Sequence, residues 1–297
     1  MNMKIQKILN RGIVMLMAST ALLVCACSDH EEDTTPSHAD LNGFAPADND
    51  HTPTAQLRRE FFQQTGSYLL FTDTLMTKSY NGQPELLEVG YSIIGSSSSY
   101  SYKYQYITDI NEQRKAADLV RTYLAPRLGK ASPFSFLLVN KISYISSGRE
   151  RFVDKVLGTR SCTISLNEGN AYDDPAGYFN GMMIDIVTDA LNKVSDEEMA
   201  PFYAFSSDYY NMDLIDFGWD NGLTELETWN LGFFRYIKSS YWGDYFLSKN
   251  NDKSEWINAV MTMSAQEFEA QYGASTIMMS KYNTLREIII NLGFVLD

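Results

Sequence analysis

The hydrophobic pattern of this chain divides the sequence into two structural halves, one that mixes strand and helix periods and one with the helix period alone. Residues 134–146 are strand-like, and residues 160–166 alternate apolar and polar side chains, as half-buried strands do. From about Tyr178 onward, apolar residues recur every three or four positions, which is the spacing of amphipathic helices. We therefore expect an α+β chain, with a small sheet in a mixed α/β first half and an all-helical second half.

Local signals place the other elements of each half. In the first half we expect helices at 55–64 and 109–124, and strands at 68–71, 86–94 and 100–107. Asp109 and Glu112 resemble a capping box for the second helix, which should stop before Pro126. In the second half we expect an irregular acidic loop at 208–222, N-terminal capping pairs Asp252–Glu255 and Ser264–Glu267, a C-cap at Gly273 and a final helix at 276–292.

The helix predicted at 182–194 lies at the junction of the two halves. Its apolar positions follow the helical rhythm, but Thr188, Asp189 and Asn192 interrupt that pattern at i, i+1 and i+4. This spacing places Thr188 and Asn192 on one face, one turn apart. In zinc metalloproteases the same spacing reads His-Glu-x-x-His.

The N-terminus has the features of an export signal. Three basic residues precede an apolar stretch at 13–24, which is too short to span a bilayer comfortably. Val24-Cys25-Ala26-Cys27 then resembles a bacterial lipobox. This resemblance implies a signal peptide at 1–26 and a lipid on Cys27; the alternative is an ordinary secretory signal cleaved near Ala26.

Residues 27–53 form a flexible acidic linker in this interpretation, because they contain almost no apolar side chains that could pack. The acidic cluster at 28–33 resembles the surface-export signal of some lipoproteins, although an ordinary charged tether would have the same composition. We expect the globular domain to occupy 54–297.

Composition excludes several classes of function. The formal net charge is −13, and it becomes −16 when cleavage of the signal peptide removes three basic residues. Such a negative charge disfavours nucleic acid as a partner. Cys162 is the only cysteine after Cys27, so the domain has no internal disulfide, and the strand pattern around Cys162 indicates a core residue. No histidine follows His51, which excludes Ser-His-Asp and Cys-His catalysis.

Several aromatic motifs resemble a known family. Pro201-Phe202-Tyr203, Tyr209-Tyr210, Trp219 and the run from Trp229 to Tyr236 are similar to those of the substrate import-associated zinc metallohydrolase lipoproteins. The resemblance implies a zincin-like fold, in which the zinc-binding helix joins an α/β subdomain, here 54–195, to a helical subdomain, here 196–297.

The same resemblance assigns the positions of an active site. The two histidine ligands fall on Thr188 and Asn192, the general base on Asp189, and the distal carboxylate ligand on Asp244. Catalytic zinc needs three protein ligands and an open position for water, and the hydroxyl and amide found here bind zinc poorly. The zinc expected for the family therefore lacks its ligands, and we expect a catalytically inactive protein.

Three interpretations of Thr188, Asp189 and Asn192 remain open. They are a hydrogen-bonded relic of a metal site, part of a calcium or magnesium site with Asp244 and Asp185 as further oxygen ligands, or residues of a plain structural helix. A calcium site within 208–222 does not match the EF-hand spacing, so we expect a solvated acidic loop there.

The expected function comes from the resemblance. The resemblance implies that the chain is a lipoprotein of the outer membrane that faces the medium at the cell surface. It would bind a peptide, a glycan or an import receptor without catalysis. Trp219, Trp229, Tyr241 and Trp242 are candidate contacts, with core packing as the alternative for Trp229. The alternatives are an active hydrolase with an atypical metal and an unrelated glycan-binding lipoprotein, which would have a β-rich second half.

The assignment of the lipid to Cys27 predicts a specific effect of one substitution. The Cys27→Ala chain should lose incorporation of a labelled fatty acid and leave the membrane fraction, because its anchor is gone. The matched Cys25→Ala chain should keep both properties. Lipid retained on the Cys27→Ala chain would contradict the assignment.

Overall fold

The computed structural model of the chain describes residues 42–76, 83–89, 101–166, 171–241 and 243–296. Contacts divide the chain into two units, Met1–Asn42 with Lys78–Gln83 and Gly43–Thr77 with Pro84–Asp297. The helices and strands of the described residues belong to the second unit. The predicted signal peptide, Cys27 and the acidic cluster lie outside the described residues, as does Trp242.

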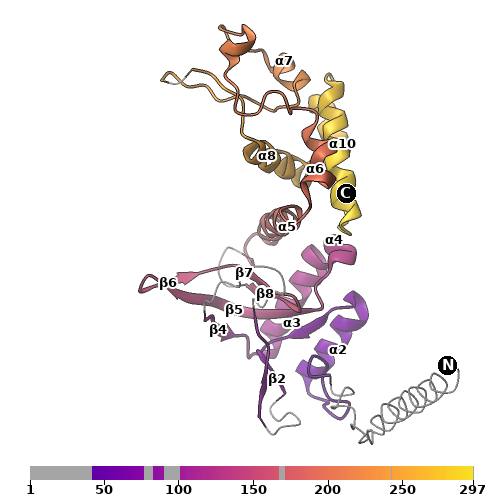
Figure 1. Cartoon of the computed structure of the whole chain (residues 1–297). Coiled ribbons are helices and arrows are strands. Elements are labelled where there is room, and N and C mark those ends of the chain that lie inside the picture. Colours follow the sequence, from indigo (N-terminus) through magenta and orange to yellow (C-terminus); the bar gives the residue numbers. More distant parts are fainter. Residues whose placement is uncertain (1–41, 77–82, 90–100, 167–170, 242, 297) are drawn as a thin grey trace, which may run out of the picture. The chain divides into compact units, whose positions relative to one another are not determined.

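Strand β5 (Ser135–Ser146) organises the sheet, because four other strands pair with it (Figure 1). Its parallel neighbours are β1 (Tyr68–Leu70) and β8 (Ser161–Ser165), and its antiparallel neighbours are β4 (Lys103–Tyr106) and β6 (Arg149–Phe152). Strand β7 (Lys155–Leu157) pairs antiparallel with β8 and ends the strand order β1-β5-β8-β7. Strands β2 (Thr74–Met76) and β3 (Glu85–Leu86) form a separate antiparallel pair.

Both faces of β5 are covered where it is most apolar. Phe136 and Leu138 pack in the cluster formed with the helices, whereas Leu137 and Val139 pack with Phe44 on the other face. All four of these β5 side chains are fully buried. Two covered faces explain why four apolar residues follow one another here instead of alternating with polar ones. The strands predicted at 134–146 and 160–166 are confirmed.

The strand predicted at 68–71 is confirmed by β1, whereas the strands predicted at 86–94 and 100–107 are confirmed only in part. Of 86–94, only Leu86 is in a strand, residues 87–89 are not, and 90–94 lie outside the described residues. Beyond the strand, the N–H of Leu87 donates to the carbonyl of Asp73 at 2.6 Å, and the Leu87 side chain is buried. Of 100–107, β4 occupies Lys103–Tyr106. Strands β2, β6 and β7 were not predicted, since runs of three or four residues carry little periodic signal.

Helices cover the sheet in the first half. They are α2 (Pro53–Thr65), α3 (Ile110–Leu119), a π-helical turn (Val120–Leu124) and α4 (Ala125–Leu128). The predicted stop before Pro126 is wrong, because the chain stays helical to Leu128. In the π turn the N–H of Ala125 donates to the carbonyl of Val120, and this wider turn accommodates a proline that has no N–H and would crowd a regular α-turn.

The second half is helical, as predicted, with the predicted loop between α6 and α7 and a further non-helical stretch between α7 and α8 that was not predicted. Its helices are α5 (Pro175–Leu191), α6 (Asp196–Tyr203), α7 (Glu225–Asn230), α8 (Lys249–Thr262), α9 (Ala265–Tyr272) and α10 (Thr276–Asn291), with a 3-10 turn at Leu214–Phe217. The described residues of 231–247 are non-helical, and Tyr245 there forms isolated β-bridges with Asp213 and Ile237. No helix in the described part of the chain is long and apolar enough to cross a membrane.

Capping explains most of these helix starts. Ser264 and Glu267 form the predicted capping box of α9, and Gly273 is its C-cap. The predicted capping role of Asp252 is wrong. Helix α8 begins one turn earlier, where the Ser248 side chain accepts from the N–H of Asn251.

Asp252 instead forms a fully buried ion pair with Lys281 of α10, at 2.7 Å. The three protons of the Lys281 ammonium are all used, since Nζ also donates to Ser206 Oγ at 2.8 Å and to the carbonyl of Gly232 at 2.9 Å. The Tyr210 hydroxyl donates to the same Asp252 oxygen at 2.8 Å. This network joins α8 and α10 to the two loops that carry Ser206 and Gly232.

Aromatic rings enclose the ammonium of Lys281. The ring centroids of Phe202, Trp256 and Phe233 lie 4.9, 5.2 and 5.3 Å from Nζ. Burial lowers the pKa of Lys281 to about 8, although the Asp252 carboxylate opposes this shift. Burial also raises the pKa of Asp252. Both shifts indicate that the pair is costly to desolvate and that each charge depends on the other.

The buried pair therefore predicts a large effect of removing one partner. Lys281→Met leaves the Asp252 carboxylate buried without its counterion and should lower the free energy of unfolding by about 3–5 kcal/mol. Adding Asp252→Leu to Lys281→Met should recover part of that loss, because no buried charge then remains. Urea denaturation measures both variants.

The control is Lys249→Met, which breaks the exposed pair of Lys249 with Asp196. Its cost should be about 1 kcal/mol or less, because water screens exposed ion pairs. Equal losses in the Lys281→Met and Lys249→Met chains would contradict the structural role of the buried pair.

Candidate functional site along α5

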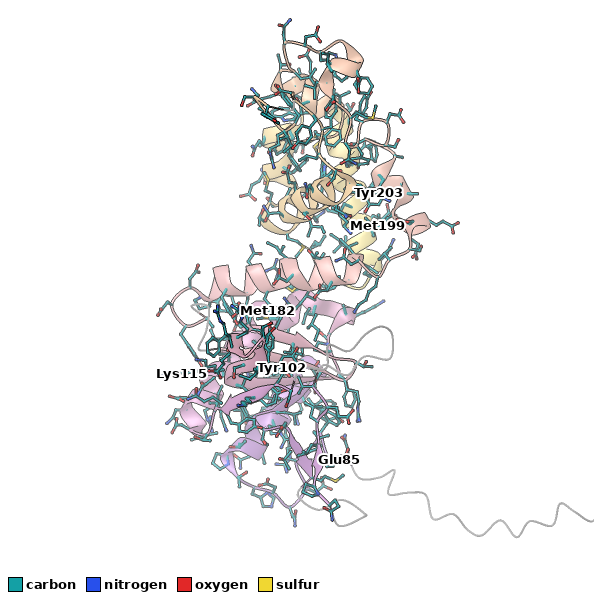
Figure 2. The ribbon with its side chains drawn as sticks, turned by 60° about the vertical axis from the view of Figure 1, so that its left-hand side comes forward. Glu85, Tyr102, Lys115, Met182, Met199 and Tyr203 are labelled. Atoms are coloured by element: carbon teal, nitrogen blue, oxygen red, sulfur yellow. The ribbon has the colours of Figure 1, made fainter. Side chains whose placement is uncertain are left out.

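Helix α5 carries the predicted site, and its sequence explains its start. The Asp174 side chain accepts from the N–H of Gly177 at 3.0 Å, and Pro175 occupies the first turn, where its missing N–H has no cost. Phe179, Met183 and Val187 recur at helical spacing and are fully buried. Met182 lies on the side of α5 that faces the sheet, as Figure 2 shows.

Polar contacts fix α5 beside the edge of the sheet. Asp185 forms an ion pair with Lys155 of β7 at 2.7 Å. The Tyr178 hydroxyl donates to the carbonyl of Ser165 at the end of β8, and burial raises the pKa of this hydroxyl. The helix is therefore anchored to β7 and β8, the two strands at that edge.

The three predicted site residues lie together on the last turns of α5, in different environments. Thr188 is half-buried, and its Oγ1 donates to the carbonyl of Ile184 at 2.7 Å. Asn192 is the C-cap, and its Oδ1 accepts from Lys253 Nζ of α8 at 2.7 Å. Asp189 is exposed, and its side chain makes no hydrogen bond or ion pair with any described residue. Two of the three positions are therefore engaged in contacts that a metal would have to break.

Asp244 lies in a different environment. Its Oδ1 accepts from the N–H of Ser239 at 3.1 Å, and its carbonyl accepts from the N–H of Leu214 at 2.9 Å. These contacts hold it against the small core of Leu214, Phe233, Phe246 and Leu247. In the described chain no hydrogen bond or ion pair links Asp244 to α5, so the structure does not join it to the other three predicted positions.

The oxygen ligands of the calcium or magnesium alternative are not assembled either. Asp185 is occupied by Lys155, and no group of three His, Cys, Asp or Glu side chains among the described residues is placed to hold a metal ion. In the loop at 208–222, the aspartates Asp208, Asp213, Asp216 and Asp220 are all exposed to solvent.

The predicted aromatic contacts divide into packed and exposed residues. Trp219 stacks on Phe217 with ring centroids 5.1 Å apart, and Trp229 makes an edge contact with Tyr272 at 5.0 Å. Both tryptophans are half-buried. Tyr241, by contrast, is 82% exposed. Trp229 therefore follows the core-packing alternative, and Tyr241 stays a candidate contact.

A cavity of about 370 Å³ lies beside the last turns of α5. It was not predicted, because four separate segments build it: 128–134, the β7–β8 connection at 157–162, α5, and the C-terminal residues 292–294. Asp189 of α5 and Lys193, two residues after the end of α5, line it together with apolar side chains. The one sequence signal that could have found it is the pairing of these opposite charges at i and i+4 within an apolar pattern.

Cys162 is a buried side chain of the core cluster, as predicted, and it lines the same cavity. Burial raises the pKa of its thiol to about 12, so the thiol stays protonated at neutral pH. A protonated thiol is a poor nucleophile and a poor metal ligand.

Comparisons with known proteins leave the identity of the site to these residues. No family model, curated protein or solved structure matches the chain. The residue assignments drawn from the family resemblance therefore remain predictions.

The environment of Cys162 predicts slow alkylation. At pH 8, a pKa of about 12 in place of 9.0 lowers the thiolate population by roughly 1,000-fold. Iodoacetamide should leave Cys162 unmodified in the folded chain and modify it fully in urea, as mass spectrometry of the peptide that contains it would show. The Cys162→Ala chain gives the background. Equal rates in folded and unfolded chains would contradict the buried thiol.

Proposed function

We propose that this chain is a lipid-anchored, catalytically inactive relative of the substrate import-associated zinc metallohydrolases. It is held at the outer membrane through Cys27 and faces the medium. The region around the last turns of α5 binds a partner without hydrolysing it. The partner is a peptide, a glycan or an import receptor, and the edge strand beside α5 favours a peptide.

The observation that carries the proposal is the state of Thr188, Asp189 and Asn192. The Thr188 hydroxyl bonds within its own helix, and the Asn192 amide oxygen bonds Lys253. Of the three, only the Asp189 side chain has no hydrogen bond or ion pair with a described residue. One carboxylate is too few for a catalytic zinc, which takes three protein ligands. Because no histidine follows His51, no imidazole can replace the missing ligands.

The position of α5 supports the zincin-like part of the proposal. The helix follows the sheet, precedes the helical half, and is bonded to the antiparallel strand β7 through Asp185 and Lys155. This order and placement match the layout that the family resemblance implies. Strand β7 ends the strand order of the sheet, and an edge strand can pair with an extended peptide through its main chain, which favours a peptide among the three partners.

The alternative of a glycan-binding lipoprotein unrelated to the zinc metallohydrolases fits less well. It requires a β-rich second half, whereas the described residues after Ala171 form helices and loops with isolated bridges.

Metal content tests the proposal. The full chain is purified in a non-ionic detergent and dialysed against micromolar zinc. Inductively coupled plasma mass spectrometry should then find far less than one zinc ion per chain. It should hydrolyse no member of a peptide library in a chelator-sensitive manner. One zinc per chain, with peptidase activity that a chelator and Asp189→Ala both remove, would show an active metallohydrolase instead.

A further inference from the structure

We infer that the cavity beside α5 binds an apolar dipeptide with free amino and carboxyl termini. The inference deepens the proposed binding function and rests on it for the choice of a peptide. It identifies a ligand class, a binding cavity and the two charged residues that recognise the ends of the ligand.

The size and walls of the cavity favour apolar groups. Leu157 of β7, Ile186 of α5 and Phe294 near the C-terminus line it, and Phe134, which is 47% exposed, adds an aromatic side chain to the lining. An apolar cavity of about 150 Å³ holds one benzene molecule. At about 370 Å³, this cavity has room for two side chains of that size, or for one side chain and part of a backbone.

The two charges in the lining favour a zwitterion. Asp189 and Lys193 are both exposed and both line the cavity, and neither forms an ion pair with a described residue. A ligand with an amine and a carboxylate can bind both at once, the amine at Asp189 and the carboxylate at Lys193. A ligand with one charge leaves the other residue without a partner.

The spacing of the two charges selects the length of the ligand. Asp189 lies in the last turn of α5 and Lys193 in the turn just after it, where the N–H of Lys193 donates to the carbonyl of Ala190 at 3.0 Å. The backbones of the two residues are therefore about 6 Å apart along the helix axis. Two extended residues span about 7 Å, so the termini of a dipeptide match this separation. A single amino acid has its charges too close together, and each further residue adds about 3.5 Å and moves one terminus away from its partner.

The test is calorimetric titration of leucyl-phenylalanine into the full chain in a non-ionic detergent. We expect saturable binding of one dipeptide per chain. Acetylation of the amine or amidation of the carboxylate should each weaken binding at least tenfold, because each removes one charge. Equal binding of the doubly blocked dipeptide, or no binding of the free one, would overturn the inference.

Substitutions assign the charges to their residues. Asp189→Asn should weaken the binding of the free dipeptide at least tenfold. It should leave the binding of the N-acetylated dipeptide unchanged, because that ligand has no charged amine for Asp189 to bind. Asp185→Asn is the matched control one turn earlier on α5, where the carboxylate lines a different cavity, and it should leave dipeptide binding unchanged. Equal effects of the two substitutions would refute the role of Asp189.

A third variant tests the cavity itself. Ala190 lines it from α5, and Ala190→Leu should fill part of it, abolish binding and keep or raise the melting temperature. Unchanged binding in a folded Ala190→Leu chain would place the ligand elsewhere. If the dipeptide does not bind a zinc-free chain, this inference is contradicted and the proposed function is not. Stoichiometric zinc would contradict the proposed function itself.

Discussion

The burial of the apolar face of α5 is the constraint on which the rest of the structure depends. Met183, Val187 and Leu191 are almost completely buried, and they belong to one hydrophobic cluster that contains residues of both halves, from Phe136 of β5 to Leu285 of α10. Because this face is committed to the core, only the polar side of the helix is available to solvent. Asp189 and Lys193 lie on that side, and the core therefore determines where α5 can meet a ligand.

The helical half adds a second, polar constraint in the ion pair of Asp252 with Lys281. Such a pair is costly to bury, and its net stabilisation is often no larger than that of apolar residues in its place. In this structure the pair also joins separate segments, because Lys281 bonds Ser206 and Gly232 as well as Asp252 and so connects α8 and α10 with the two loops. The described residues of 231–247 are thus positioned by a charge as well as by the aromatic core around Phe233 and Phe246.

The sequence could predict features that depend on neighbouring residues. The strand at 134–146 and the capping box of Ser264 follow from composition and short-range chemistry. It could not predict the helical continuation through Pro126, which needs a π turn, or the use of Asp252 as a buried counterion, which depends on Lys281 twenty-nine residues away. The cavity beside α5 was missed for the same reason, since four separate segments build it.

The central claim is that the last turns of α5 form a ligand-binding surface without a metal centre. Diffraction at the zinc absorption edge, from crystals of the full chain grown with zinc, tests it most directly. We predict that no anomalous peak will mark a zinc ion bound by Thr188, Asp189 or Asn192, and that Lys253 will still be hydrogen-bonded to Asn192. An anomalous peak coordinated by Asp189 and a second residue of α5 would contradict it.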